Sequence, residues 1–149
     1  YWRSLDLNPP FRWVMGADDL NRKTAAFKPF FVERGYALVY VDVRGTGASF
    51  GTFRGPFSPE EANDAYEVTE WLAAQPWSTG KIGMYGRSYL GITQYMAAGK
   101  APPHLKAIFP EMAEFDHYSF IYPGGIFHDD FFRQWGKANV RQRRSGRVL

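Results

Sequence analysis

The segment Lys81-Ile-Gly-Met-Tyr-Gly-Arg-Ser-Tyr-Leu-Gly91 decides the fold class of this sequence. Its first five residues suit a short strand, and residues 89–98 have the pattern of a helix. A serine on a sharp turn from a strand into a helix is the sequence form of a nucleophile elbow. Because that turn strains the backbone and brings helix and strand close together, it needs small neighbours. We expect this need to be met by Gly83, Gly86 and Gly91, and Ser88 to be the nucleophile.

The sequence around this segment predicts alternating helices and strands. Strands are expected at residues 37–43, 81–85 and 105–109, and helices at residues 24–34, 59–75, 89–98 and 125–135. Ser58, Pro59 and Glu61 have the spacing of an N-terminal capping box. The order β–α–β–α–β predicts a parallel sheet with right-handed crossovers.

Length and composition exclude several classes of protein. The 149 residues fit one ordinary domain but are too few for a complete large α/β enzyme. No cysteine is present, which excludes disulfides and cysteine-based metal sites. No apolar run approaches the roughly 18 residues that would predict a membrane span. The 45% hydrophobic content argues against disorder.

The basic charge is concentrated at one end. Five of the 18 basic residues and no acidic residue lie within residues 137–149, so the remainder holds 13 basic and 15 acidic residues. This tail raises the alternative of weak, salt-dependent polyanion binding. Because the chain opens on Tyr1 in an aromatic segment and no signal peptide is visible, we expect both ends to be cut or altered.

Several blocks together resemble the CocE/NonD hydrolases, which are related to X-Pro dipeptidyl-peptidases and cocaine esterase. They occur in the family's order up to about Gly136, beyond which the tail shows no resemblance. The blocks are Tyr1-Trp-Arg3, Phe27-Lys-Pro-Phe-Phe31, Gly35-Tyr36, Asp42-Val-Arg-Gly-Thr-Gly-Ala-Ser-Phe-Gly51, Glu70-Trp-Leu-Ala-Ala-Gln-Pro-Trp77, Gly83-Met-Tyr-Gly-Arg-Ser-Tyr-Leu-Gly91 and Tyr122-Pro-Gly-Gly125.

The resemblance implies roles for three residues. Ser88 is implied as the acylated nucleophile, the Tyr89 N–H as one oxyanion donor and the Tyr1 hydroxyl as the second. The family's form of the elbow, G-x-S-Y-x-G, accounts for Leu90 in the place where the common pattern has glycine. Arg87 is unusual at the variable position and leaves substrate preference open.

The base and acid of a catalytic triad are not evident. The chain has three histidines, of which His104 has the setting of a surface residue. Asp116 and His128 are a weak alternative, because triad acid and base normally follow two further strands. A metal site from His128, Asp129 and Asp130 is also weak, because adjacent side chains point in different directions. We therefore expect the triad partners to be encoded beyond this chain, and the chain alone to be inactive.

A dinucleotide-binding alternative rests on Gly45-Thr-Gly47 after an apolar run. That fingerprint requires the glycines to open a helix directly. Here the loop continues through Phe57, and the third glycine, Gly51, comes one position late. We expect instead that Asp42 and Arg44 organise the loop.

The sequence thus predicts a partial α/β-hydrolase fold, its nucleophile half, followed by the start of a helical cap. The expected divisions are a core at residues 1–110, the start of the cap at 111–136 and the basic tail at 137–149. The expected function is that of a serine hydrolase fragment acting on a small-molecule ester or peptide. No cofactor, nucleic acid or membrane partner is expected, and a non-functional degenerate fragment is the other alternative. The compartment is left open, with the cytoplasm slightly favoured.

Overall fold

The computed structural model describes residues 29–145, with side chains up to Lys137. The chain divides into two compact units. One is Asp42–Phe132, and the other includes the described residues 29–41 and 133–145. The predicted elbow lies wholly in the first unit, together with both strands of the sheet and the helices that pack on them.

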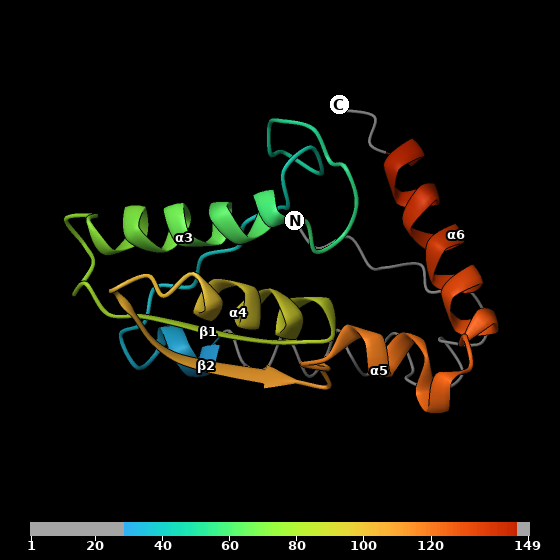
Figure 1. Ribbon diagram of the computed structural model, residues 1–149. Helices are drawn as coiled ribbons and strands as arrows, with labels where there is room; N and C mark the ends of the chain where they lie inside the picture. Colours follow the sequence, from blue (N-terminus) through green and yellow to red (C-terminus); the bar gives the residue numbers. More distant parts are fainter. Residues whose placement is uncertain (1–28, 146–149) are drawn as a thin grey trace. The chain divides into compact units, whose positions relative to one another are not determined.

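A short parallel sheet carries the elbow. Strand β1 (Ile82–Arg87) pairs with β2 (Leu105–Glu111), with Ile82 opposite Leu105 and Arg87 opposite Glu111. Helix α4 (Tyr89–Gly99) makes the crossover and packs against both strands, and α3 (Pro59–Ala73) packs on α4 (Figure 1). This parallel strand pair with flanking helices is the arrangement expected for the nucleophile half of the predicted fold.

The capping box predicted at the start of α3 is confirmed. The Ser58 hydroxyl accepts a hydrogen bond from the Glu61 backbone N–H at 3.2 Å, and the Glu61 carboxylate accepts one from the Ser58 N–H at 3.3 Å. These two bonds satisfy N–H groups that a helix start otherwise leaves without a partner. Pro59 at the first helical position loses nothing, because its missing N–H would have no acceptor there.

The strand predicted at residues 37–43 is wrong. The sheet that the described residues form contains β1 and β2, and the segment is irregular. The side chains of Val39, Tyr40 and Val41 are 47%, 47% and 56% exposed. An apolar run is only a strand when a neighbouring strand accepts its backbone hydrogen bonds, and composition cannot supply that neighbour. The expected β–α–β–α–β order is thus reduced to β–α–β.

The helix predicted at residues 24–34 is described from residue 29 onward, and residues 24–28 lie outside the described part. Residues 29–32 are helical. Gly35 then takes φ +79°, while its N–H donates to the Val32 carbonyl and the Tyr36 N–H donates to the Phe31 carbonyl, both at 3.0 Å. Gly35 is therefore the C-terminal stop that the sequence predicts.

The segment after β2 is helical in short pieces and then in one long helix. Helix α5 (His117–Ile121) and the 3₁₀ turn η1 (Pro123–Gly125) precede α6 (Asp129–Ser145). The helix predicted at residues 125–135 therefore starts four residues later and continues through most of the basic tail. Within residues 29–145, no helix combines the length and apolarity needed to span a membrane.

The core of the elbow unit contains buried polar residues as well as buried apolar ones. Among the described residues, the buried apolar side chains are Ala62, Ile92, Ala97 and Pro102, and the buried polar ones are Glu61, Thr69 and Gln94. Buried polar groups are tolerated when they are hydrogen-bonded, and no described buried side-chain polar atom lacks a partner. Two of these polar residues contact the elbow directly.

Candidate active site

Ser88 has the strained backbone that a nucleophile elbow requires. It lies between β1 and α4 with φ 58° and ψ −121°. Its N–H donates to the Glu111 carbonyl at 2.9 Å, and its own carbonyl accepts from the N–H groups of Gly91 and Ile92 at 2.7 and 2.9 Å. A non-glycine residue in such a conformation costs on the order of 1–3 kcal/mol and persists only when its surroundings enforce it. The hydrogen bonds on both sides of Ser88 supply that enforcement.

Two of the three glycines at the elbow are sterically required. A Cβ on Gly86 would lie 2.5 Å from the Leu90 Cβ, and one on Gly91 would lie 2.5 Å from the Ala113 Cβ. The expectation for Gly83 is wrong, because its nearest neighbour would be the Ala107 carbonyl oxygen at an ordinary 3.8 Å. The close approach of strand and helix is thus confined to the turn itself.

Tyr89 is held from its side-chain end. Its ring packs on the Phe57 ring with the centroids 4.4 Å apart, and its hydroxyl donates to Glu61 Oε2 at 2.6 Å. Burial and the hydrogen bond to Glu61 both raise the pKa of the Tyr89 hydroxyl. Because Tyr89 is the first residue of α4, its backbone N–H has no acceptor within the helix. That N–H is therefore suited to bind an incoming negative charge.

The raised pKa of Tyr89 predicts a loss of stability at high pH. The unfolded tyrosine ionises near pH 10, whereas the folded one keeps its proton to higher pH. Above about pH 10 the native state therefore binds more protons, and the free energy of unfolding falls by up to ~1.4 kcal/mol per pH unit. We expect Tyr89→Phe to remove this part of the slope. Urea unfolding of both proteins at pH 8, 10 and 11 measures it, and parallel profiles would contradict the assignment.

Arg87 is tied to the end of the neighbouring strand. Its guanidinium forms a salt bridge with the Glu111 carboxylate, in which the two side chains are 30% and 44% exposed. Glu111 is also the residue whose carbonyl binds the Ser88 N–H. The unusual arginine therefore fastens the strand end on which the conformation of Ser88 depends.

The glycine-rich loop is organised by Asp42 and Arg44, as expected. The Asp42 carboxylate accepts from the Ala48 N–H at 3.0 Å. Arg44 binds Asp64 of α3 with both nitrogens of its fork, Nε lying 2.6 Å from Oδ2. Since α3 begins only at Pro59, the glycines do not open a helix, and the dinucleotide fingerprint is not formed.

The histidines are not joined to Ser88. His104 Nδ1 lies 2.6 Å from Glu70 Oε2, His117 Nδ1 lies 3.5 Å from Glu114 Oε1, and the His128 ring stacks on Phe131. Within the described part of the chain, no hydrogen bond links any of these histidines to Ser88.

Asp116 is the N-cap residue of α5. Its Oδ1 accepts from the Tyr118 N–H at 3.0 Å and its Oδ2 from the Ser119 hydroxyl, so it caps α5. The Ser119 hydroxyl and the Tyr118 N–H hold the pKa of Asp116 below its usual value. The described residues contain no cluster of three or more histidine, aspartate or glutamate side chains fit to hold a metal ion. Tyr1, expected as the second oxyanion donor, lies outside the described residues.

Sequence reasoning missed two contacts at the elbow. The sequence indicates Glu61 only as a capping residue, and it does not indicate a role for Gln94. Gln94 is fully buried and binds the carbonyls of Gly86 and Leu90 and the N–H of Phe109. Its signal in the sequence is an amide side chain within a largely apolar helix, because polar groups that become buried must find hydrogen-bond partners.

Comparison with known proteins agrees with this geometry. A solved CocE/NonD family hydrolase from Staphylococcus aureus is similar to 70% of this chain, with a TM-score of 0.64 and 40% identity, and the chain covers 19% of it. The fold and the elbow thus place the chain in the α/β-hydrolase fold class. The family model of the X-Pro dipeptidyl-peptidases (S15 family) matches residues 7–147, and the chain belongs to this family. The match also extends the resemblance past Gly136, through most of the basic tail.

Proteins named as esterases and proteins named as dipeptidyl-peptidases are both similar to this chain. A Mycobacterium bovis protein named for serine esterase activity is 38% identical over 93% of this chain. The cocaine esterase of a Rhodococcus strain is 43% identical over 70% of the chain. An Xaa-Pro dipeptidyl-peptidase of Lacticaseibacillus casei is 32% identical over 70%. The chain spans 23%, 18% and 16% of these three relatives' lengths, respectively.

Proposed function

We propose that the chain carries the nucleophile of an acyl-transfer hydrolase, with Ser88 as the attacking residue. The observation that supports this most directly is the Ser88 backbone at φ 58° and ψ −121°. A conformation this costly is held at the junction of a strand and a helix by bonds from both sides. In that position the serine hydroxyl is raised above the strand ends, where an ester or amide carbonyl can approach.

The oxyanion formed by that attack would be bound by the Tyr89 N–H and, as a second donor, by the Tyr1 hydroxyl. The Tyr89 N–H is at the first position of α4, where the helix dipole favours negative charge. The bond that breaks is the one between the carbonyl carbon and its alcohol or amine, which leaves an acyl group on Ser88. Water then releases the acid and restores the serine.

The substrate is proposed to be a small ester or a peptide. The relatives' names include both an esterase and an Xaa-Pro dipeptidyl-peptidase, so the class of carbonyl is not narrowed further. No cofactor enters the reaction as written, because hydroxyl attack and hydrolysis need only a base and water. We expect the isolated chain to show little turnover, since no described histidine is bonded to Ser88 to accept its proton.

The test supplies the missing base from solution. The chain is incubated with a fluorophosphonate, with and without imidazole, and the modified serine is identified by peptide mass spectrometry. We expect imidazole to raise labelling at Ser88 by about tenfold, which is less than a positioned base contributes. Ser78, whose hydroxyl accepts from the Gly80 N–H at 3.1 Å, is the internal comparison and should stay near background.

Ser88→Ala is the required control and should abolish the imidazole-dependent signal. Turnover of an activated ester by the chain alone should remain at the level of this variant. Robust turnover that Ser88→Ala removes would contradict the expected inactivity. Equal labelling of Ser78 and Ser88 would contradict the proposal and favour a degenerate fragment.

A further inference from the structure

Glu61 is a buried carboxylate that has no cationic partner among the described residues. The residue is 6% exposed, and no salt bridge reaches it within residues 29–137. Both of its oxygens are nevertheless used. Oε1 accepts from the Ser58 N–H at 3.3 Å, and Oε2 accepts from the Tyr89 hydroxyl at 2.6 Å. Its surroundings are therefore neutral donors and the N-terminus of α3.

A capping role does not by itself explain this burial. Burying an ionised carboxylate is unfavourable unless hydrogen bonds and local dipoles compensate for the lost water. A capping glutamate does its work equally well at the surface, where it remains hydrated. The shorter of the two contacts is the one to Tyr89, which lies 28 positions away in the sequence. The position of Glu61 is thus matched to Tyr89 as well as to the helix start.

The contact leads directly to the elbow. Tyr89 follows Ser88, and its side chain is fixed by the Phe57 ring along its face and by Glu61 at its hydroxyl. Fixing a side chain at both places restricts rotation of its own backbone. We propose that Glu61 is a positioning residue that holds Tyr89 so that its N–H points at the oxyanion. This inference rests on the proposed function of Ser88 and assigns a residue of α3 to the same site.

The test is a double-mutant cycle on the full chain. The variants Glu61→Gln, Tyr89→Phe and the double variant are compared in the imidazole-assisted labelling of Ser88. Tyr89→Phe keeps the ring and the backbone N–H and removes only the hydroxyl. We expect each single variant to slow labelling by about tenfold, as a small misplacement of a reacting group does. The double variant should be no slower than Tyr89→Phe alone.

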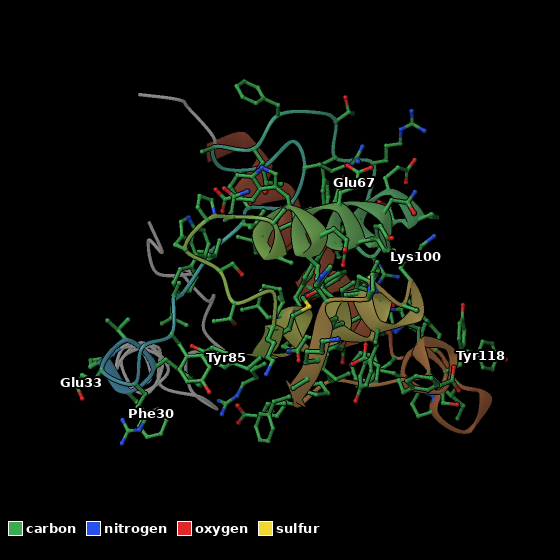
Figure 2. All side chains as sticks on the ribbon, turned by 90° about the vertical axis from the view of Figure 1, so that its left-hand side faces the viewer. Phe30, Glu33, Glu67, Tyr85, Lys100 and Tyr118 are labelled. Carbon is green, nitrogen blue, oxygen red and sulfur yellow. The ribbon has the colours of Figure 1, made fainter. Side chains whose placement is uncertain are left out.

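Glu67→Gln is the matched control. Glu67 is an exposed residue of the same helix, on the side of α3 that faces away from α4 (Figure 2), so its substitution removes the same charge without touching Tyr89. It should leave labelling unchanged. Thermal unfolding of each variant shows that the chain is folded at the assay temperature, and if Glu61→Gln unfolds, Tyr89→Phe alone carries the test.

The possible outcomes separate the two proposals. Absence of Ser88 labelling in the unsubstituted chain would refute the proposed function. Normal labelling in Glu61→Gln, or in Tyr89→Phe, would refute the positioning role and leave the proposed function standing. If the double variant were slowed by the product of the two single effects, the positioning role would also be refuted. Glu61 would then act independently of Tyr89, through the start of α3. A slowed single variant with no further loss in the double supports it.

Discussion

Gly91→Ala should destabilise the chain strongly although it adds one methyl group. The new Cβ would lie 2.5 Å from the Ala113 Cβ and 3.2 Å from the carbonyl oxygens of Glu111 and Gly86. None of these atoms belongs to a flexible side chain, so α4 must move away from the strands. Overpacking of this kind costs about 1–3 kcal/mol and occasionally more, against a gain of about 1 kcal/mol from alanine in a helix. We expect a net loss of up to about 2 kcal/mol, measured by urea unfolding.

Gly99→Ala is the control in the same helix. Nothing lies within 4 Å of the position that its Cβ would take. The same substitution at the end of α4 therefore gains helix propensity without a clash, and should leave stability unchanged or raise it by up to about 1 kcal/mol. Opposite signs at the two positions would show that the cost at Gly91 is steric. Equal effects would show that α4 does not pack closely at the elbow.

Displacement of α4 should also reach Ser88. The N–H of Gly91 donates to the Ser88 carbonyl at 2.7 Å, so a shift of the first turn of the helix pulls on the strained residue itself. Because few buried apolar side chains are described, the elbow unit has little other packing to resist this shift. A loss that reaches about 2 kcal/mol is a large part of the stability of a small domain. Gly91→Ala should therefore reduce Ser88 labelling even where the chain is still folded.

The features that sequence predicted correctly are those with a local signal. The start of α3 follows from Ser58, Pro59 and Glu61, and the elbow follows from a strand, a serine and a glycine pair within ten residues. In each case the atoms that decide the structure are close in sequence. Capping and glycine stereochemistry act over one or two turns, so the residues that determine these features are neighbours in the sequence.

The features that sequence could not predict depend on distant partners. Residues 37–43 have the composition of a buried strand, but strand pairing needs a second strand at the right place. Glu61 is recognisable as a cap, whereas its bond to Tyr89 depends on how α3 packs on α4. Gly83 and Gly86 lie in the same strand, but neighbouring atoms approach closely only at Gly86. Long-range packing decides all three.

Gln94 makes long-range hydrogen bonds that connect α4 with both strands. Its side chain is completely buried in α4. Nε2 donates to the Leu90 carbonyl at 2.7 Å and the Gly86 carbonyl at 3.3 Å, while Oε1 accepts from the Phe109 N–H at 2.8 Å. One amide thus joins the helix, the approach to the elbow and the second strand. These contacts need a side chain that carries both a donor and an acceptor, and the amide of glutamine provides both.

Gln94→Leu should therefore destabilise the chain by about 2–4 kcal/mol even though leucine is apolar and similar in size. The Phe109 N–H loses its acceptor and the Gly86 carbonyl loses a donor, in a place that water does not reach. An unsatisfied buried group costs about 1–3 kcal/mol, which greater hydrophobicity at one site does not offset. Urea unfolding measures the loss, and amide hydrogen exchange should show a specific loss of protection at Phe109.

The comparison that isolates burial is Gln75→Leu. Gln75 makes a similar bond, from its Nε2 to the Trp71 carbonyl at 2.8 Å, but this bond is exposed to solvent. Water can replace it, so the same substitution should change stability by less than about 0.5 kcal/mol. If both variants lost equal stability, the side-chain amide of Gln94 would have no special role. A large loss at position 94 with unchanged exchange at Phe109 would place the cause in packing instead of the hydrogen bond to β2.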